Sequence, residues 1–199
     1  VLADATDDFK ARIFGDSPAK PVLLTLKPGA VVRISAYVGD FNGRPDLKLD
    51  QLEPLTDAER ADPAIMGRLT PVSQHDPLKM KAELLAIVGR IPHAGLRATV
   101  ESVLAEHGER FCEAVAALGM HHAFRHGLLE HTLRMAKCAE ALLPLYPKVD
   151  PSLAVAGIVL HDVGKIQEYS RLEPGMAKAG FTRAGNLHGH LVLGAFLVR

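Results

Sequence analysis

Two stretches decide the fold of the carboxyl-terminal half: GLLEHTLRMAKCAEALLPLY at 127–146 and LAVAGIVLHDVGK at 153–165. In the first stretch, Leu128, His131 and Met135 recur at helical spacing, so we expect His131 to lie on the stripe that faces the core. The second stretch is apolar on nearly every side before its HDVGK ending, which is typical of a buried helix. Both stretches therefore predict helices that meet in the interior of one domain.

The HDVGK ending places a histidine and a carboxylate side by side, at His161 and Asp162, where the buried helix ends. A single histidine on a core-facing stripe, such as His131, is more often a hydrogen-bonded core residue than a metal ligand. The doublet changes this interpretation, because a buried imidazole and carboxylate are costly unless a cation satisfies both. The sequence has no CxxC pair, so the donors favour Mn, Fe, Ni, Co or Zn over a structural thiolate zinc.

The helical pattern extends over 77–199. It begins at Asp76, an N-cap aspartate followed by proline at the first helical position. Further helices are expected up to Gly108, from about 109 to 118, and around 187–198, where His190 lies. The carboxyl-terminal half is therefore predicted to be all-helical.

The first 55 residues alternate in the manner of β-strands. Apolar runs with period two occur at 22–26, 31–38 and 47–52, with glycine and proline between them. This pattern predicts a small barrel or an open sheet with one buried side. Four prolines interrupt the polar stretch that follows, so we expect domains at 1–55 and 77–199 with a linker at 56–76.

The composition excludes several classes of protein. With 48% hydrophobic and 23% charged residues, the chain is globular rather than disordered. No apolar run reaches the roughly 18 residues of a membrane span, so no membrane partner is expected. Lys and Arg total 23, as do Asp and Glu, which gives no broad basic face, so a polyanion would need a local site. Two cysteines and no secretory leader predict a reducing cytoplasm.

The motifs resemble those of known metalloenzymes. GLLEHT together with HDVGK resembles the HD-domain metal-dependent phosphohydrolases. More narrowly, MHHAFRHGLLEHTLRMAK, AGIVLHDVGKIQEY and LHGHLVLG resemble the YhaM-type 3'-to-5' exoribonucleases, in which an OB-fold precedes the HD domain. In the front half, LADATDDFKARIF and LKPGAVVRISAYVGDFNGRPDLKLDQLEPL resemble strands of such a barrel. The resemblance implies an α+β chain with a small, incomplete OB-like β-barrel followed by an all-α HD domain.

The resemblance also implies roles for individual residues. His131, His161 and Asp162 match the metal ligands of the family, with Asp162 placed to bridge two ions where the site is binuclear. His190 matches the histidine that binuclear members add. Lys165 matches a lysine near the phosphate and would act with Asp162 in catalysis, although an exposed lysine at a helix end is an equal alternative.

Further residues are expected to touch the substrate. His122 and Arg125 precede the first ligand and could bind phosphate or base. The remaining histidines are interpreted as turn, surface or second-shell residues: His75, His93, His107, His121, His126 and His188. In the OB-like half, aromatic faces and arginines could hold a nucleic-acid strand, at Arg33, Tyr37, Phe41 and Arg44, although an aromatic residue in a barrel is more often core.

The function implied is hydrolysis of single-stranded RNA from its 3' end with a divalent metal. Manganese is the first choice, with Fe, Co, Ni, Mg and Zn as alternatives. Single-stranded DNA as a second partner and a homo-oligomer stay open. One rival function is an HD phosphohydrolase of nucleotides or other small phosphate esters. The other is a single-stranded nucleic-acid-binding module with an inactive HD scaffold.

Both ends depart from the family pattern. An OB-fold needs about five strands, and Val1 falls inside what resembles the second. The closing aspartate of the family is expected beyond Arg199. The sequence therefore predicts an OB-like half without its first strand and an HD half without its last part.

Overall fold

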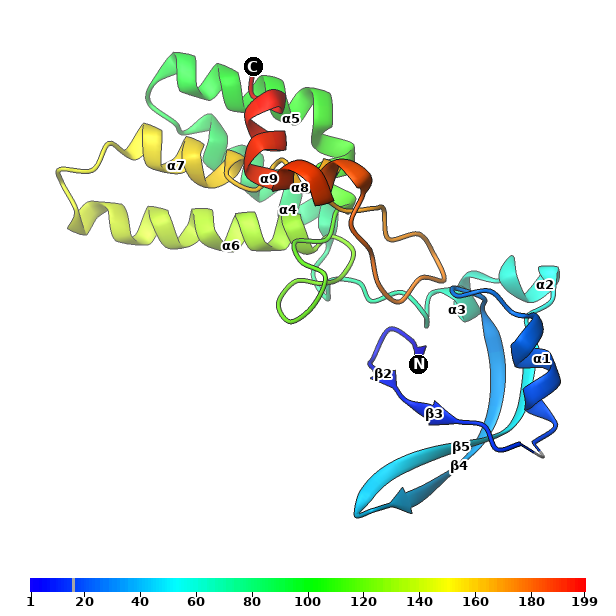
Figure 1. Cartoon of the computed structure of the whole chain (residues 1–199). Helices are drawn as coiled ribbons and strands as arrows, with labels where there is room; N and C mark the ends of the chain where they lie inside the picture. The colour runs from blue at the N-terminus through cyan, green and yellow to red at the C-terminus, as the bar shows by residue number, and fades with distance from the viewer. Residues whose placement is uncertain (16) are drawn as a thin grey trace. The chain divides into compact units, whose positions relative to one another are not determined.

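The computed structural model describes residues 1–15 and 17–199 and divides them into two compact units (Figure 1). The first unit comprises 1–71 together with 173–177, and the second comprises 72–172 together with 178–199. The sequence did not predict the return of 173–177 to the first unit. The domain limits at residues 55 and 76 stay a prediction.

The first unit is built on a long hairpin. Strands β4 (Val32–Phe41) and β5 (Arg44–Pro54) pair antiparallel, and β3 (Ala11–Arg12) pairs parallel with β5, which gives the order β3-β5-β4. Strands β1 (Leu2–Ala3) and β2 (Asp8–Phe9) form a separate two-stranded sheet. Within the described residues these strands do not close into a barrel, so the OB-like barrel stays a prediction.

The predicted strand at 22–26 is wrong, because this stretch lies within and just after helix α1 (Ala19–Thr25). Ala19 is buried and packs with Leu49 and Leu52 of β5, while Leu24 is exposed. The run of apolar residues is compatible with either structure when it is taken alone. Packing of one helical face against the hairpin decides the outcome, as tertiary contacts commonly do for short apolar runs.

The predicted linker at 56–76 contains two short helices, α2 (Asp57–Arg60) and α3 (Pro63–Met66). The side chains of Thr56 and Glu59 form a capping box at the start of α2. Asp62 caps α3 in the same way that an Asp-Pro pair starts the longer helices.

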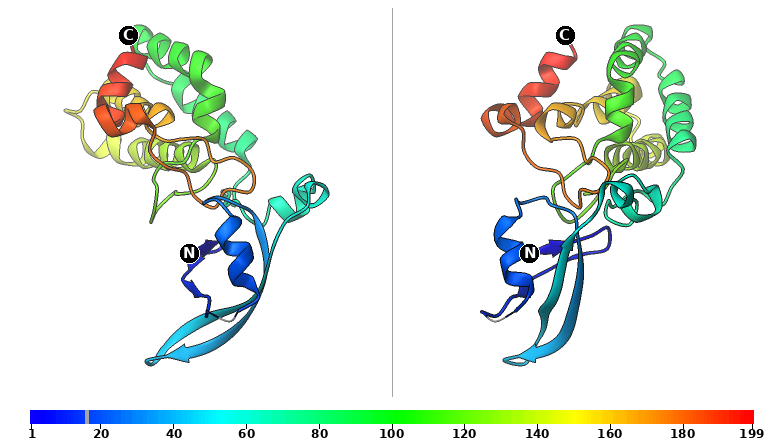
Figure 2. Two further views of the ribbon diagram at one scale, coloured as in Figure 1. Left: turned by 45° about the vertical axis from the view of Figure 1, so that its right-hand side comes forward. Right: turned by 90° about the vertical axis from the view of Figure 1, so that its right-hand side faces the viewer.

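The second unit is helical, as predicted (Figures 1 and 2). Its elements are α4 (Pro77–Gly89), α5 (Ala94–Glu113), α6 (Gly127–Leu142), the 3₁₀ helix η1 (Leu143–Leu145), α7 (Pro151–Leu160), α8 (Lys165–Glu168) and α9 (Arg183–Leu197). The Asp-Pro signals are confirmed, because Asp76 and Asp150 accept hydrogen bonds from the first backbone amides of α4 and α7. The predicted helix break at Gly108 is wrong: α5 continues to Glu113 because Gly108 and Phe111 are buried together on its inner face.

The core of this unit lies between α4, α5, α6 and α7. On α6 the buried hydrophobic residues are Leu128, Leu129, Leu133 and Ala136, so the core stripe lies beside the predicted one, and His131 lies at its edge. The antiparallel α6 and α7 lie side by side, which brings the amino-terminal half of α6 to the carboxyl end of α7 (Figure 1). Among the helices described, none combines the length and apolar character that a membrane crossing requires.

The packing predicts that replacing two leucines of α6 by alanine lowers the free energy of unfolding by different amounts. Leu128 is fully buried, so Leu128→Ala should lower the free energy of unfolding by about 2–5 kcal/mol through lost contacts and a cavity. Leu142, which is 51% exposed, serves as the control, and Leu142→Ala should cost less than about 0.5 kcal/mol. Urea denaturation followed by circular dichroism measures both. Equal losses would contradict the assigned core.

Candidate metal centre

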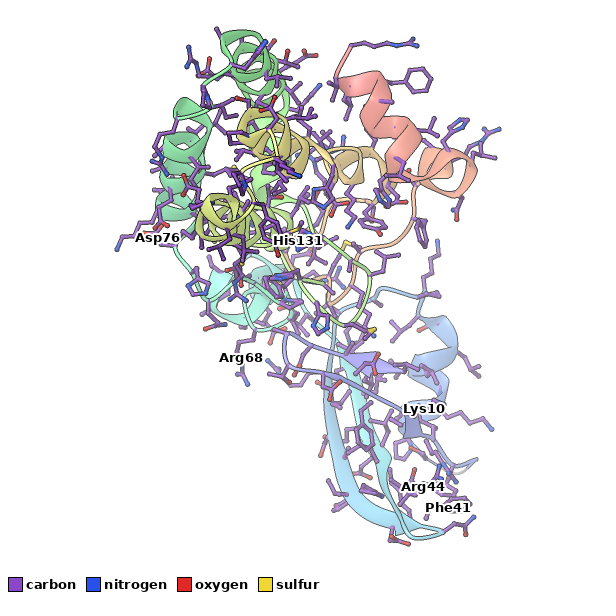
Figure 3. The ribbon with its side chains drawn as sticks, turned by 90° about the vertical axis from the view of Figure 1, so that its left-hand side faces the viewer. Lys10, Phe41, Arg44, Arg68, Asp76 and His131 are labelled. Atoms are coloured by element: carbon purple, nitrogen blue, oxygen red, sulfur yellow. The ribbon has the colours of Figure 1, made fainter. Side chains whose placement is uncertain are left out.

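Three helical segments bring histidines to one buried carboxylate. Asp162, which follows α7, is 4% exposed. Its Oδ2 atom lies 3.4 Å from Nε2 of His131 on α6 and 3.2 Å from Nε2 of His161. One ligand atom from each of these three residues lies within 4.8 Å of the others, and the His131 and His161 rings are 5.5 Å apart. Figure 3 labels His131 in the second unit.

His190 reaches the other oxygen of the same carboxylate. Its Nε2 atom lies 3.5 Å from Oδ1 of Asp162. A kink at Gly189, where φ is 69°, turns α9 immediately before this histidine. Gly164 allows the close approach, because a Cβ there would overlap the backbone of His190 and Gly194. The four predicted ligand residues therefore lie together, although 59 sequence positions separate His131 from His190.

Hydrogen bonds behind the histidines orient their rings. Nδ1 of His161 lies 2.8 Å from the carbonyl oxygen of Ile158, and Nδ1 of His190 lies 3.1 Å from the carboxylate of Glu168. These contacts at Nδ1 fix the orientation of each ring, and Nε2 of each ring faces Asp162. Tyr169 also donates to the buried Glu168 carboxylate, and burial raises the pKa of this phenol to about 12.

The electrostatics keep Asp162 ionised. Burial acts to raise its pKa, but hydrogen bonds from His161 and Lys165 outweigh this and lower the pKa to about 2. The Lys165 ammonium donates to Oδ2 over 2.7 Å. Burial lowers the pKa of His131, which favours the neutral form that ligates metals, whereas the hydrogen bond with Asp162 raises the pKa of His161. A buried carboxylate among imidazole nitrogens is a donor set that fits a divalent cation.

A strained loop brings His122 to this centre. Its ring lies 5.5 Å from the His131 ring, and Nδ1 is buried with no hydrogen-bond partner among the described residues. Met120, His122 and His126 all have positive φ, which costs free energy in residues other than glycine. Gly127 permits the turn, because a Cβ there would overlap the His122 carbonyl. Arg125 instead pairs with Glu113 at 2.5 Å, so its role with substrate stays a prediction.

Sequence reasoning missed two buried glutamates. Glu168 orients His190, and Glu130 accepts hydrogen bonds from Ser73 and Arg134, each over 2.6 Å. The i,i+4 spacing of Glu130 and Arg134 is a signal for their ion pair, but not for the burial of the carboxylate. Nothing in the spacing of Glu168 from HDVGK indicates its contact with α9.

The other histidines have varied surroundings. His93 is exposed, and its ring accepts a hydrogen bond from the Leu96 amide and so caps α5. His107 is also more enclosed than predicted, with 21% of its side chain exposed. Nδ1 of His126 bonds to the Cys112 carbonyl, while His188 is exposed.

The predicted nucleic-acid residues lie in the first unit. Tyr37 and Phe41 are exposed, and the Arg12 guanidinium lies 3.6 Å from the centre of the Phe41 ring. Phe41 and Arg44 are partners across the hairpin and are labelled in Figure 3. Arg33 is bound to Glu59 over 2.5 Å. Their role in binding stays a prediction.

The second unit therefore combines a helical fold with a histidine–aspartate centre that could hold a metal ion. Comparison with protein families agrees, since residues 128–199 match the HD domain. The chain is 31% identical over 191 residues to the "3'-5' exoribonuclease YhaM" of Halalkalibacterium halodurans, and 27% identical over 191 residues to the protein of that name in Bacillus subtilis. Each alignment covers 96% of this chain, with 57% and 58% of the respective relative.

The resemblance predicted from the motifs is therefore confirmed: residues 128–199 match the HD domain, and the chain is similar to YhaM exoribonucleases over almost its whole length. The chain spans little more than half the length of these relatives. No solved structure matches it.

The contact between Gly164 and α9 generates a prediction about the centre. Gly164→Ala should displace His190, lower the unfolding free energy by about 1–3 kcal/mol and weaken Mn²⁺ binding. Gly157→Ala is the matched control, because its Cβ would meet open space on α7 and should stabilise the helix by about 0.5–1 kcal/mol. Thermal melting and calorimetric Mn²⁺ titration measure the two effects. Unchanged Mn²⁺ affinity in Gly164→Ala would show that His190 is not held by this contact.

Proposed function

We propose that the chain hydrolyses phosphodiester bonds with the help of one or two divalent cations. The observation that carries the proposal is that histidines approach both oxygen atoms of the Asp162 carboxylate. His131 and His161 face Oδ2, and His190 faces Oδ1. A carboxylate that is buried, ionised and approached on both oxygens by imidazoles is suited to hold cations rather than to pack a core.

His131, His161 and Asp162 would hold one ion, and His190 with the second oxygen of Asp162 would contribute to another. When bound, such an ion lowers the pKa of a water toward neutrality and offsets negative charge on a phosphate. Manganese is the first choice, because the donors are nitrogen and oxygen without thiolate. No protein nucleophile is needed.

The protein itself orients the ligands and supplies positive charge. Ile158 and Glu168 hold the imidazoles of His161 and His190 so that Nε2 of each faces the carboxylate. Lys165 is bound to Asp162 and would neutralise charge on the phosphoryl oxygens of a substrate beside it. His122, whose buried Nδ1 has no hydrogen bond among the described residues and lies 3.9 Å from the Glu130 carboxylate, would contact the same substrate from the α6 side.

The substrate we propose is single-stranded RNA, degraded from its 3' end. The similarity to relatives named 3'-5' exoribonuclease supports the direction and the substrate. The exposed rings of Tyr37 and Phe41, with the cations Arg12 and Arg44, support a strand-binding surface in the first unit, because single strands bind through stacking and phosphate contacts.

Two other functions make different predictions. A phosphohydrolase of nucleotides or small phosphate esters would cleave those esters faster than an RNA strand. A binding module with an inactive HD scaffold would keep its affinity for RNA after chelation and would never cleave it. An assay with RNA labelled at either end separates both alternatives from an exonuclease.

Asp162→Asn should lower the rate of RNA hydrolysis by several orders of magnitude, because it removes the anionic group shared by the proposed ions. The assay follows 5'-labelled and 3'-labelled single-stranded RNA on gels, with chelator or with Mn²⁺. The 5' label should pass through a ladder of shortening products, and the 3' label should appear at once as mononucleotide. His188→Ala, an exposed histidine on the same helix as His190, is the control and should retain activity. Full turnover by Asp162→Asn would refute the proposal.

A further inference from the structure

Two aromatic residues, Tyr169 and Phe181, lie at the two ends of the loop between α8 and α9, and neither is a candidate metal ligand. Tyr169 directly follows α8 and Phe181 directly precedes Thr182, the N-cap residue of α9. Their ring centroids are 5.4 Å apart with an interplanar angle of 59°, and their backbones form an antiparallel bridge. The pair therefore closes the base of the loop between α8 and α9.

The pair is attached to the centre through a single carboxylate. The Tyr169 hydroxyl donates to Glu168, and the same carboxylate accepts hydrogen bonds from the backbone amide and the ring of His190. Tyr169 is also close enough to Asp162 for the charge of Asp162 to act on it. Tyr169 therefore connects the centre to Phe181, whose ring centroid lies 5.4 Å from that of Tyr169.

Hydrogen bonds anchor the backbone on either side of the exposed Phe181 ring. Phe181 is 52% exposed, whereas Tyr169 is half-buried. The adjacent Thr182 fixes the backbone, because its amide bonds to the Glu168 carbonyl and its hydroxyl to the Gln167 carbonyl over 2.6 Å. On the other side, the amide of Ser170 bonds to the Gly180 carbonyl over 2.8 Å.

We infer that Phe181, supported by Tyr169, is a stacking platform for the base of the nucleotide whose phosphate lies at the metal centre. The inference rests on the proposed function and adds to it a residue that selects nucleotides over other phosphate esters. An exposed apolar ring on an anchored backbone offers a flat face to a ligand, and every nucleobase has a π-face that can cover it. Stacking of this kind tolerates all four bases, which suits successive removal of nucleotides.

The absence of tryptophan from the sequence makes a direct test possible. Phe181→Trp keeps an aromatic ring at the platform and introduces the only indole, whose fluorescence a stacked base quenches. The probes are AMP, which has a base, and ribose 5-phosphate, which has the same phosphate and sugar without one. Both are titrated in the presence of Mn²⁺, and their affinities for the unmodified chain are measured by calorimetry.

We expect AMP to quench the fluorescence of Phe181→Trp and ribose 5-phosphate to leave it unchanged. We also expect the unmodified chain to bind AMP about tenfold more tightly than ribose 5-phosphate, which is the size expected for one base–aromatic stack. Phe181→Leu, which keeps an apolar side chain without a ring, should lose this preference. Tyr146→Trp is the control, because Tyr146 lines a cavity of about 470 Å³ at the opposite end of α6 and α7.

Several results would overturn the inference. These are equal affinities for AMP and ribose 5-phosphate, quenching of Tyr146→Trp in place of Phe181→Trp, a preference that survives in Phe181→Leu, or no binding of AMP. Thermal melting of each variant checks that the fold is retained, and Phe181→Trp provides a second reading where Phe181→Leu is unstable. Cleavage of labelled RNA by the unmodified chain is scored separately, so failure of the platform and failure of the hydrolase are distinguishable.

Discussion

The structure of the helical unit depends on one buried negative charge. An ionised carboxylate away from water is tolerated only when donors or cations surround it, and Asp162 is 4% exposed. Lys165 supplies one charge, and the imidazoles of His131, His161 and His190 surround the remaining directions. The positions of α6, α7 and α9 set the geometry of the centre, since each of these helices brings a histidine to the same two oxygen atoms.

Close backbone packing makes that convergence possible. Gly164 lets α9 approach until the His190 carbonyl fills the place of a side chain, and Gly185 lets the start of α9 approach the Glu168 backbone in the same way. The contact between α8 and α9 therefore sets the position of His190, while Glu168 sets the direction of its ring. The same carboxylate binds Tyr169, so the geometry of the proposed cation site and that of the proposed base platform depend on one another.

Sequence reasoning succeeded where local chemistry decides the structure and failed where packing does. The Asp-Pro starts of α4 and α7 depend on a side chain and amides a few residues away, and the structure has both. The sequence wrongly predicts a strand at 22–26, because the apolar residues there do not reveal that the preceding Ala19 packs against Leu49 and Leu52. The buried Glu168 was missed for a related reason, since its partner His190 lies 22 residues further along the chain.

The sequence by itself determined the class of the second unit and its family resemblance, because helix signals, helical periodicity and the HD doublet are all local. It also identified His131, His161, Asp162 and His190 as candidate ligands. Only the tertiary structure decided which Asp162 oxygen each histidine faces, since this depends on how closely α9 packs on Gly164. It likewise decided that the short strands of the first unit form open sheets within the described residues, because pairing between strands depends on contacts that no single stretch contains.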